Sequence, residues 1–198
     1  SVASAMRGGV VALGNFDGFH KGHQAVVGEA IRAARERGVP ALVATFDPHP
    51  VHYFKKDVAP FRLTSLDQRE ALFAEAGADA MLVFHFDARL ASLTAEEFAE
   101  RHLSPFSGVV TGEDFTFGKA RRGNLEILRQ HGLAAKAVPP VTDAGGIISS
   151  SRIREALKAG DCDEATRLLT RPFAVQGPVI HGDKNGRKLG FPTANIFM

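Results

Sequence analysis

The feature that most constrains the fold is a short apolar run that leads through a glycine-rich loop into an amphipathic stretch. The run Val10–Leu13 ends at Gly14, and from Val26 onward apolar residues recur at helical spacing until Gly38. A strand, a glycine-containing loop and a helix, in this order, present backbone N–H groups and the positive end of the helix to an anion. The sequence therefore predicts a phosphate-binding loop over residues 14–24.

The same alternation continues along the chain. Four more short apolar runs are typical of buried parallel strands, and the stretches between them have helical spacing, two of them opening with capping boxes. The runs are 41–46, 80–86, 108–111 and 135–138, and the boxes pair Ser65 with Gln68 and Thr94 with Glu97. This pattern predicts an α/β fold with a doubly wound, Rossmann-like parallel sheet. Ligands of such sheets bind at the carboxyl ends of the strands, so we expect the loops 14–23, 47–50 and 112–118 on one rim.

Composition excludes several classes of function. The 198 residues allow one sizeable core, or one core and a fragment of another. A formal net charge of +2 is too small to favour nucleic acid as a partner. Cys162 is the single cysteine, which excludes an internal disulfide and a multi-cysteine metal site. No run is long enough to span a membrane or to serve as a signal peptide, so we expect no membrane partner and a cytoplasmic location.

Two histidines stand three residues apart in the first loop. His20 and His23, with Gly22 between them, can approach the same anion, and imidazole is a donor or a cation near neutral pH. A hydrogen-bonded loop pair or two metal ligands are simpler explanations of this spacing. Neither a cysteine nor a third histidine lies close in sequence, so zinc is less favoured, and the position at a strand-to-helix turn favours phosphate chemistry.

A second phosphate-binding signal lies at 149–154. Three consecutive serines open an amphipathic helix, and Arg154 follows one turn later. Hydroxyls and free N–H groups at a helix start bind phosphate, and arginine can reach the same anion. An ordinary serine N-cap explains one of the serines but not all three.

Two other loops carry aromatic residues and prolines. Phe115 and Phe117 are bracketed by glycines and acids and followed by arginines, which fits a planar ring that carries a phosphate. Their alternation places both on one face, so at least one is expected to pack in the core. The stretch 45–50 contains two prolines, which stiffen a turn and can fix a loop against a ligand.

Taken together and in this order, the motifs resemble the bacterial bifunctional riboflavin kinase/FMN adenylyltransferases, or FAD synthetases, of the nucleotidyltransferase superfamily. The resemblance covers residues 7–170, and its one departure is Ser151, where the family usually has threonine. It implies ATP and FMN as substrates, with Mg²⁺, and assigns residues to each step. The catalytic residues implied are His20, His23, Ser150, Ser151 and Arg154. ATP would also contact Gly14, Asn15, Phe16, Asp17 and Gly18, and FMN would contact Phe46, Pro48, His49, Asp114, Phe115, Phe117 and Gly118.

The last stretch resembles a different domain. After Arg171-Pro172-Phe173, the segments 177–182 and 186–195 resemble the opening of the riboflavin kinase β-barrel. The resemblance implies that Thr193 and Asn195 would hold Mg²⁺ and ATP phosphates there. We therefore expect an adenylyltransferase domain over 1–170 and a kinase fragment over 171–198. A barrel needs more strands than the remaining residues supply, so riboflavin kinase activity is expected only with a complete second domain.

The expected reaction is attack of the FMN phosphate on the α-phosphorus of ATP, giving FAD and pyrophosphate. That phosphate is already anionic, so positioning and charge stabilisation suffice without a general base. Three alternatives remain open at this point: a flavin or nucleotide sensor without turnover, an adenylyl- or cytidylyltransferase for another phosphate acceptor, and a scaffold role for the partial second domain. The sequence leaves the oligomeric state undetermined.

Overall fold

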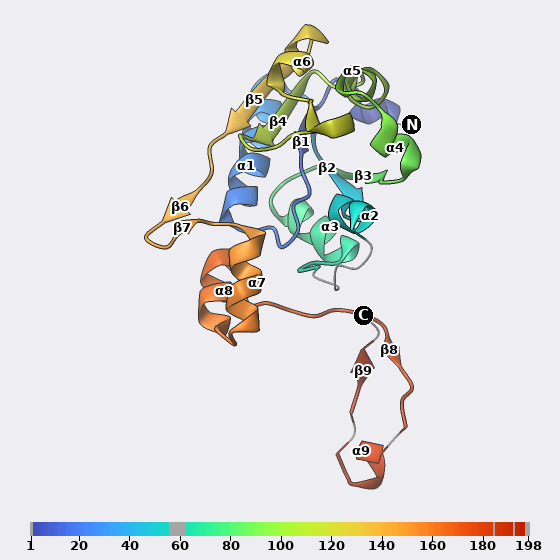
Figure 1. Ribbon diagram of the computed structural model, residues 1–198, viewed down its shortest axis with the longest axis vertical. Helices are drawn as coiled ribbons and strands as arrows, with labels where there is room; N and C mark the ends of the chain where they lie inside the picture. Colours follow the sequence, from blue (N-terminus) through green and yellow to red (C-terminus); the bar gives the residue numbers. More distant parts are fainter. Residues whose placement is uncertain (1, 56–61, 184, 192, 197–198) are drawn as a thin grey trace.

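The computed structural model describes residues 2–55, 62–183, 185–191 and 193–196 (Figure 1). Its centre is a five-stranded sheet in the order β3-β2-β1-β4-β5, and every neighbouring pair is parallel. The strands are β1 (Val10–Leu13), β2 (Ala41–Asp47), β3 (Ala80–His85), β4 (Gly108–Gly112) and β5 (Ala134–Val138). The chain winds outward from β1 in both directions, which confirms the doubly wound sheet. The expected rim follows, because the loops after β1, β2 and β4 all leave the same edge.

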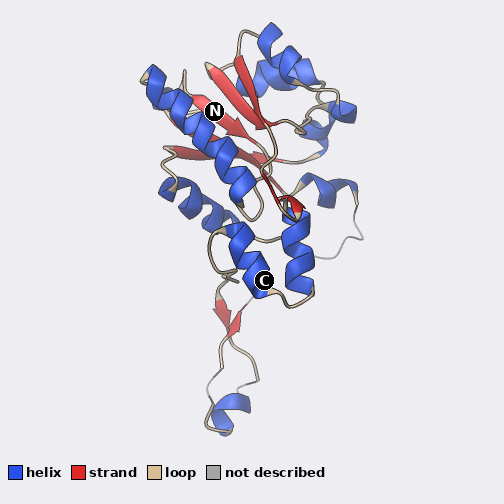
Figure 2. Ribbon diagram, turned by 90° about the vertical axis from the view of Figure 1, so that its left-hand side faces the viewer, coloured by secondary structure: helices blue, strands red, loops and turns tan. Residues whose placement is uncertain are grey.

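Helices cover both faces of the sheet (Figure 2). On one face, α1 (Lys21–Arg37) and α3 (Leu66–Glu75) pack on Val10 and Ala12 of the central strand. On the other face, Val11 and Leu13 meet a second cluster of apolar side chains. Its helices are α4 (Ala88–Ser92), α5 (Ala95–Phe98), the π-helical turn Ala99–Leu103 and α6 (Leu125–Gln130). The alternation of side chains along β1 thus supplies both cores.

The predicted helix signals are present in the structure. Ser65 and Thr94 each complete a capping box with the residue three positions later, and Gly38 ends α1 in the left-handed conformation. Asp161 caps α8 (Cys162–Leu169) by accepting from the amide of Glu164. These helix boundaries depend on hydrogen bonds within a few residues, which is why they could be predicted locally.

Beyond β5, the chain forms a helical pair below the sheet. A short hairpin of β6 (Thr142–Asp143) and β7 (Gly146–Ile147) leads into α7 (Ser150–Lys158), which packs against α8. The pair has its own apolar core, which includes Ile153 and Leu168 and extends to Ile148 and Leu63. The α7–α8 pair is thereby attached to the segment that precedes α3.

An extended segment then leads away from α8 (Figure 1). There β8 (Val179–Ile180) pairs antiparallel with β9 (Asn195–Ile196), and α9 (Asn185–Lys188) lies between them in sequence. Apolar side chains of this segment, such as Leu189 and Phe191, are exposed. Within the described ranges, no helix has the length and apolar character needed to cross a bilayer.

Phe73 on α3 should be a main determinant of stability. It is 1% exposed, and its ring contacts those of Phe16 and Phe19, with centroid distances of 5.9 and 5.0 Å. We expect Phe73→Ala to lower the free energy of unfolding by about 3–5 kcal/mol, because it leaves a cavity under the first loop. The same change at Phe191, which is 76% exposed, should alter it by less than about 0.5 kcal/mol. Urea unfolding of both variants checks this, and equal effects would contradict the assignment.

Candidate active site

The first loop is held in an unusual backbone conformation by aromatic packing. Phe16 and Phe19 have positive φ angles of 49° and 41°, which side-chain-bearing residues rarely adopt. Both rings are buried against Phe73, so the core compensates for the backbone strain. At Gly14, a Cβ atom would lie 2.9 Å from the Phe16 ring, so a larger residue would displace that ring. Packing in the core therefore supports this shape of the loop.

Asp17 joins the first loop to the segment before α3 and to α7. Its buried carboxylate accepts from the amides of Leu63 and Thr64, both at 3.0 Å, and forms an ion pair with Arg154 at 2.5 Å. The Ser150 hydroxyl donates to the Asp17 carbonyl at 2.8 Å. The two predicted phosphate-binding motifs are thus connected directly, although 137 residues separate Asp17 from Arg154. The Asp17 carboxylate, implied above as an ATP contact, is engaged by protein groups.

The serine cluster divides into different roles. Ser149 is the N-cap of α7 and accepts from the amide of Arg152, while Ser150 is occupied with Asp17. Ser151 is exposed in the first turn of α7. Arg152 contacts Asp143 and Glu164 rather than the first loop. Ser151 is therefore the member of this motif that is best placed to meet a ligand, while Arg154 is engaged by Asp17.

His20 is the N-cap of α1, a role that the sequence analysis did not predict. Its Nδ1 accepts from the amides of Gly22 and His23 at 3.2 and 3.4 Å. Burial lowers the pKa of His20 to about 4, against the opposing effect of Asp17. At neutral pH the ring is uncharged, and because Nδ1 is an acceptor its proton is on Nε2. His20 can therefore donate one hydrogen bond from Nε2.

His23 stacks on His20 with the ring centroids 3.7 Å apart and the planes inclined by 22°. The edge of the Phe16 ring contacts it from another direction, at a centroid distance of 5.4 Å. Burial lowers the pKa of His23 well below its ordinary value, and His20 and Arg154 lower it further. Its buried Nδ1 has no hydrogen-bond partner among the described residues. Both histidines are therefore neutral. Of the two roles expected from the sequence, hydrogen-bond donor or cation, the structure favours that of a donor.

The loop after β2 brings a third histidine towards the same group. The Asp47–Pro48 peptide bond is cis, and His49 caps α2 (Pro50–Phe54) by accepting from the amide of Val51 at 3.2 Å. Burial lowers the pKa of His49 to about 4, and the charges of Asp17 and Arg154 act on it in opposite directions. His49, assigned above to the flavin, therefore lies within electrostatic reach of the phosphate-binding motifs.

The predicted flavin-binding aromatics separate into core and surface. Phe46 and Phe117 are each 6% exposed and belong to the core around Phe98, with centroid distances to Phe98 of 6.3 and 5.6 Å. Phe115 is half-buried and stacks on both of them, at 6.5 and 6.4 Å. Asp114 is exposed at the start of the same loop. The aromatic stack thus connects the loops after β2 and β4, and Phe115 offers most of the ring surface that remains accessible.

Gly118 ends that loop against α5. Its φ angle is 71°, and a Cβ atom would lie 2.7 Å from the Ala95 nitrogen, so this approach requires glycine. The next residues include Ala120 and Arg121, both with a φ of 57°. Gly118 is therefore explained by backbone packing, whatever its role towards a ligand.

Arg69 is a site residue that the sequence analysis missed. It is 3% exposed, and one guanidinium nitrogen donates to the Asn15 carbonyl at 3.1 Å and to the Thr45 hydroxyl at 3.0 Å. Burial lowers its pKa, and its charge in turn lowers that of His23. Arg69 and Phe73 are the buried residues of α3. An arginine one turn before a core phenylalanine, on the apolar face of a helix, was the signal that could have identified it.

No group of three or more His, Cys, Asp or Glu residues within the described part of the chain is arranged to hold a metal. The one buried carboxylate in this region, Asp17, is engaged by Arg154 and backbone amides. Thr193 and Asn195, the kinase-side residues, are exposed and lie apart from this site in the β8–β9 segment (Figure 1). Around the first loop, the described residues therefore offer no cluster of carboxylates or imidazoles for Mg²⁺.

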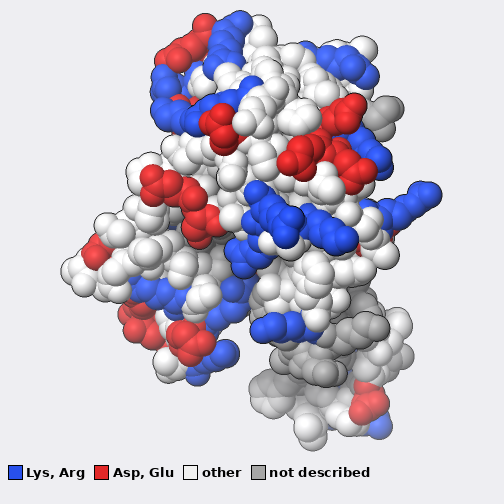
Figure 3. All heavy atoms as spheres, turned by 45° about the horizontal axis from the view of Figure 1, so that its top comes forward, with Lys and Arg blue, Asp and Glu red and all other residues white. Residues whose placement is uncertain are grey.

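The viewed face in Figure 3 carries acidic and basic side chains in small interspersed groups. Such a mixture agrees with the small net charge and provides no continuous basic track on that face. Within the site, Arg69 and Arg154 lie near the buried carboxylate of Asp17, and the charge of Asp47 also acts on Arg69.

The lowered histidine pKa values predict a loss of stability in acid. His20 binds its proton at about pH 4 in the folded chain and at its ordinary value of 6.5 when unfolded, so acid favours the unfolded chain. The stability that comes from keeping His20 neutral is fully present above pH 6.5 and is lost as the pH falls towards 4. In this window the free energy of unfolding should decrease by up to about 1.4 kcal/mol per pH unit. We expect His20→Asn, which retains an N-cap side chain, to flatten the pH dependence of the unfolding free energy in this window.

Urea titrations across that range measure the effect, with His131→Asn as the control, since His131 is exposed at the end of α6. An equally steep dependence in His20→Asn and the wild type would contradict a buried, neutral His20.

Two known protein families match different parts of this chain. A family model described as FAD synthetase matches residues 2–152, and one described as riboflavin kinase matches residues 169–198. Similar curated proteins are bifunctional riboflavin kinase/FMN adenylyltransferases from Pseudomonas fluorescens, 42% identical, and from Escherichia coli K12, 39% identical, each covering 96% of this chain. A Bacillus subtilis relative with the same description is 40% identical over 94% of the chain.

The chain spans about 61–63% of the length of these relatives. Among solved structures, one described as a macrolide-efflux protein from Streptococcus pneumoniae is similar over 96% of this chain and 64% of its own. It has a TM-score of 0.80 and 36% sequence identity. The family model that includes both the first loop and the start of α7 covers most of the chain, and this chain therefore belongs to the FAD synthetase family.

Proposed function

We propose that this chain transfers the adenylyl group of ATP to FMN, forming FAD and pyrophosphate. The observation that carries the proposal is the direct connection of the two phosphate-binding motifs through Asp17, Ser150 and Arg154. It brings two neutral histidines, a helix N-terminus and a buried arginine to one site. Membership of the FAD synthetase family supports FMN and ATP as the substrates.

In the proposed step, an oxygen of the FMN phosphate attacks the α-phosphorus of ATP. A new phosphorus–oxygen bond forms, the bond to the bridging β-oxygen breaks, and its electron pair leaves on pyrophosphate. The nucleophile is anionic at neutral pH, so no residue has to remove a proton from it. The chain therefore has to align the two phosphates and stabilise the charge that develops on the leaving group.

The buried cations suit this task. Arg69 and Arg154 share the buried carboxylate of Asp17, and burial lowers the pKa of each, which means that both are incompletely solvated. A bound polyphosphate would supply the missing negative charge. The bound phosphates would also raise the pKa values of His20 and His23 towards their ordinary range. Either imidazole would then donate more strongly as negative charge accumulates on the leaving pyrophosphate.

We assign Ser151 and the first turn of α7 to the β,γ end of ATP, because that helix start is exposed and its dipole favours an anion. Phe115 and Asp114 are assigned to the flavin, with Phe46, Phe117, Pro48 and Gly118 as the scaffold that holds this surface. Mg²⁺ is proposed to arrive with the ATP phosphates, which is consistent with the absence of a carboxylate cluster in the described residues. Riboflavin kinase activity, with Thr193 and Asn195 on its metal, is proposed for a protein with a complete second domain.

Pyrophosphate release from ATP tests the proposal directly. With Mg²⁺ present, release should depend on added FMN, and chromatography should show FAD in equal amount. Tight FMN binding without release would indicate a sensor instead, and release driven by another phosphate, such as phosphopantetheine, would change the acceptor. Titration with each acceptor in turn separates these outcomes.

His20→Asn should reduce kcat by about a hundredfold or more, because the donor that stabilises the leaving group is lost while the helix cap is retained. Binding of ATP, measured by calorimetry without FMN, should weaken far less. His131→Asn serves as the matched control and should keep the wild-type kcat. Losses of similar size in kcat and in ATP affinity would mean that His20 only binds the nucleotide.

A further inference from the structure

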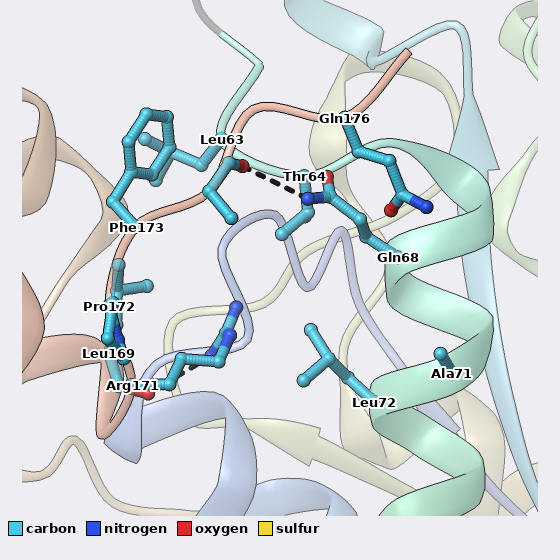
Figure 4. A pocket seen from close by; sticks show the side chains of 11 residues that line it. Leu63, Thr64, Gln68, Ala71, Leu72, Leu169, Arg171, Pro172, Phe173 and Gln176 are labelled. Atoms are coloured by element: carbon cyan, nitrogen blue, oxygen red, sulfur yellow. Dashed lines mark hydrogen bonds between the residues drawn. The ribbon is translucent and has the colours of Figure 1, made fainter. Parts of the chain in front are cut away.

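Arg171 reaches back from the segment after α8 to the first loop. Its two terminal nitrogens donate to the carbonyls of Gly18 at 2.7 Å, Phe19 at 3.3 Å and Leu169 at 3.0 Å. Figure 4 shows Arg171 extending beside Leu169 into a cavity of about 220 Å³, whose opposite wall carries Gln68 and Leu72 of α3. From the sequence, Arg171 is placed only at the start of the expected kinase fragment, 171–198.

These hydrogen bonds fix the orientation of a peptide group. In a trans peptide the C=O and N–H bonds point in opposite directions, and the peptide between Phe19 and His20 is trans. With its carbonyl held on the Arg171 side, the His20 amide must point to the other side of the loop. Within the described residues that amide donates no hydrogen bond, whereas the amide of Phe19 donates to the Phe16 carbonyl.

A second side chain holds the same carbonyl. Gln24 on α1 donates from Nε2 to the Phe19 carbonyl at 3.0 Å and to the Thr170 hydroxyl at 2.9 Å. Phe19 has a positive φ angle, so this peptide orientation is not one that the backbone prefers by itself. Arg171 and Gln24 therefore stabilise this strained backbone through the Phe19 carbonyl.

We propose that Arg171 is a positioning residue for the phosphate-binding loop: it holds the Phe19–His20 peptide so that the His20 amide donates to a phosphate oxygen of the nucleotide. The inference rests on the proposed function for its substrate, but Arg171 itself lies outside the motifs assigned to the reaction. It also gives the segment matched by the riboflavin kinase model, residues 169–198, a role in the first domain.

The test compares Arg171→Met and Arg171→Lys in the 198-residue chain, with Arg167→Met as the control. Arg167 is a neighbouring arginine that contacts Asp143 and Glu164 instead of the loop. We expect kcat/KM for ATP to fall about tenfold to a hundredfold in Arg171→Met, to fall less in Arg171→Lys, and to stay unchanged in the control. Gln24→Leu should be non-additive with Arg171→Met, because both residues hold one carbonyl.

The His20 amide resonance provides a second measurement that a purely structural role would not change. On addition of Mg–ATP it should shift downfield in the wild type, as expected of a new hydrogen bond to phosphate, and shift less in Arg171→Met at equal folded fraction. An unchanged amide response in Arg171→Met would overturn the proposal, even if thermal unfolding showed lower stability. If the wild type released no pyrophosphate, the proposed function would fail, while the amide response would still decide the role of Arg171.

Discussion

The buried carboxylate of Asp17 is the interaction on which the rest of the site depends. A charged group away from water is stable only when its oxygens are fully hydrogen-bonded, and Asp17 meets this requirement with two backbone amides, a hydroxyl and a guanidinium. These partners come from the segment before α3 and from α7, which are far apart in the chain. Satisfying one carboxylate therefore attaches two distant segments to the first loop.

The assembled site holds three arginines around one buried carboxylate. Burial lowers the pKa of Arg69, Arg154 and Arg171, while the charge of Asp17 opposes this at the first two and that of Glu75 at Arg171. His20 and His23 remain neutral chiefly because they are buried, and the charge of Arg154 lowers both pKa values further. Under the proposed function, a bound polyphosphate would add negative charge beside both histidines and would raise their pKa values.

Aromatic packing supports the other part of the site. The stack of Phe46, Phe115 and Phe117 joins the ends of β2 and β4, and its inner members are continuous with the core around Phe98. A rigid aromatic surface on fixed strands offers a planar ligand a preformed contact at little entropic cost. The first loop uses the same device, because Phe16 and Phe19 are anchored on Phe73.

Much of this protein was determined by local sequence. Strand order along the chain, the two capping boxes and the placement of three loops on one rim follow from patterns within a few residues and from the chirality of α/β connections. The residue types of the two phosphate motifs were likewise readable in sequence. What tertiary structure alone decided was how those residues are used: that His20 caps a helix and is neutral, that Phe46 and Phe117 are core, and that Arg69 and Arg171 hold the loop. Burial and pairing decide charge state and orientation, and here both depend on contacts between residues up to 153 positions apart.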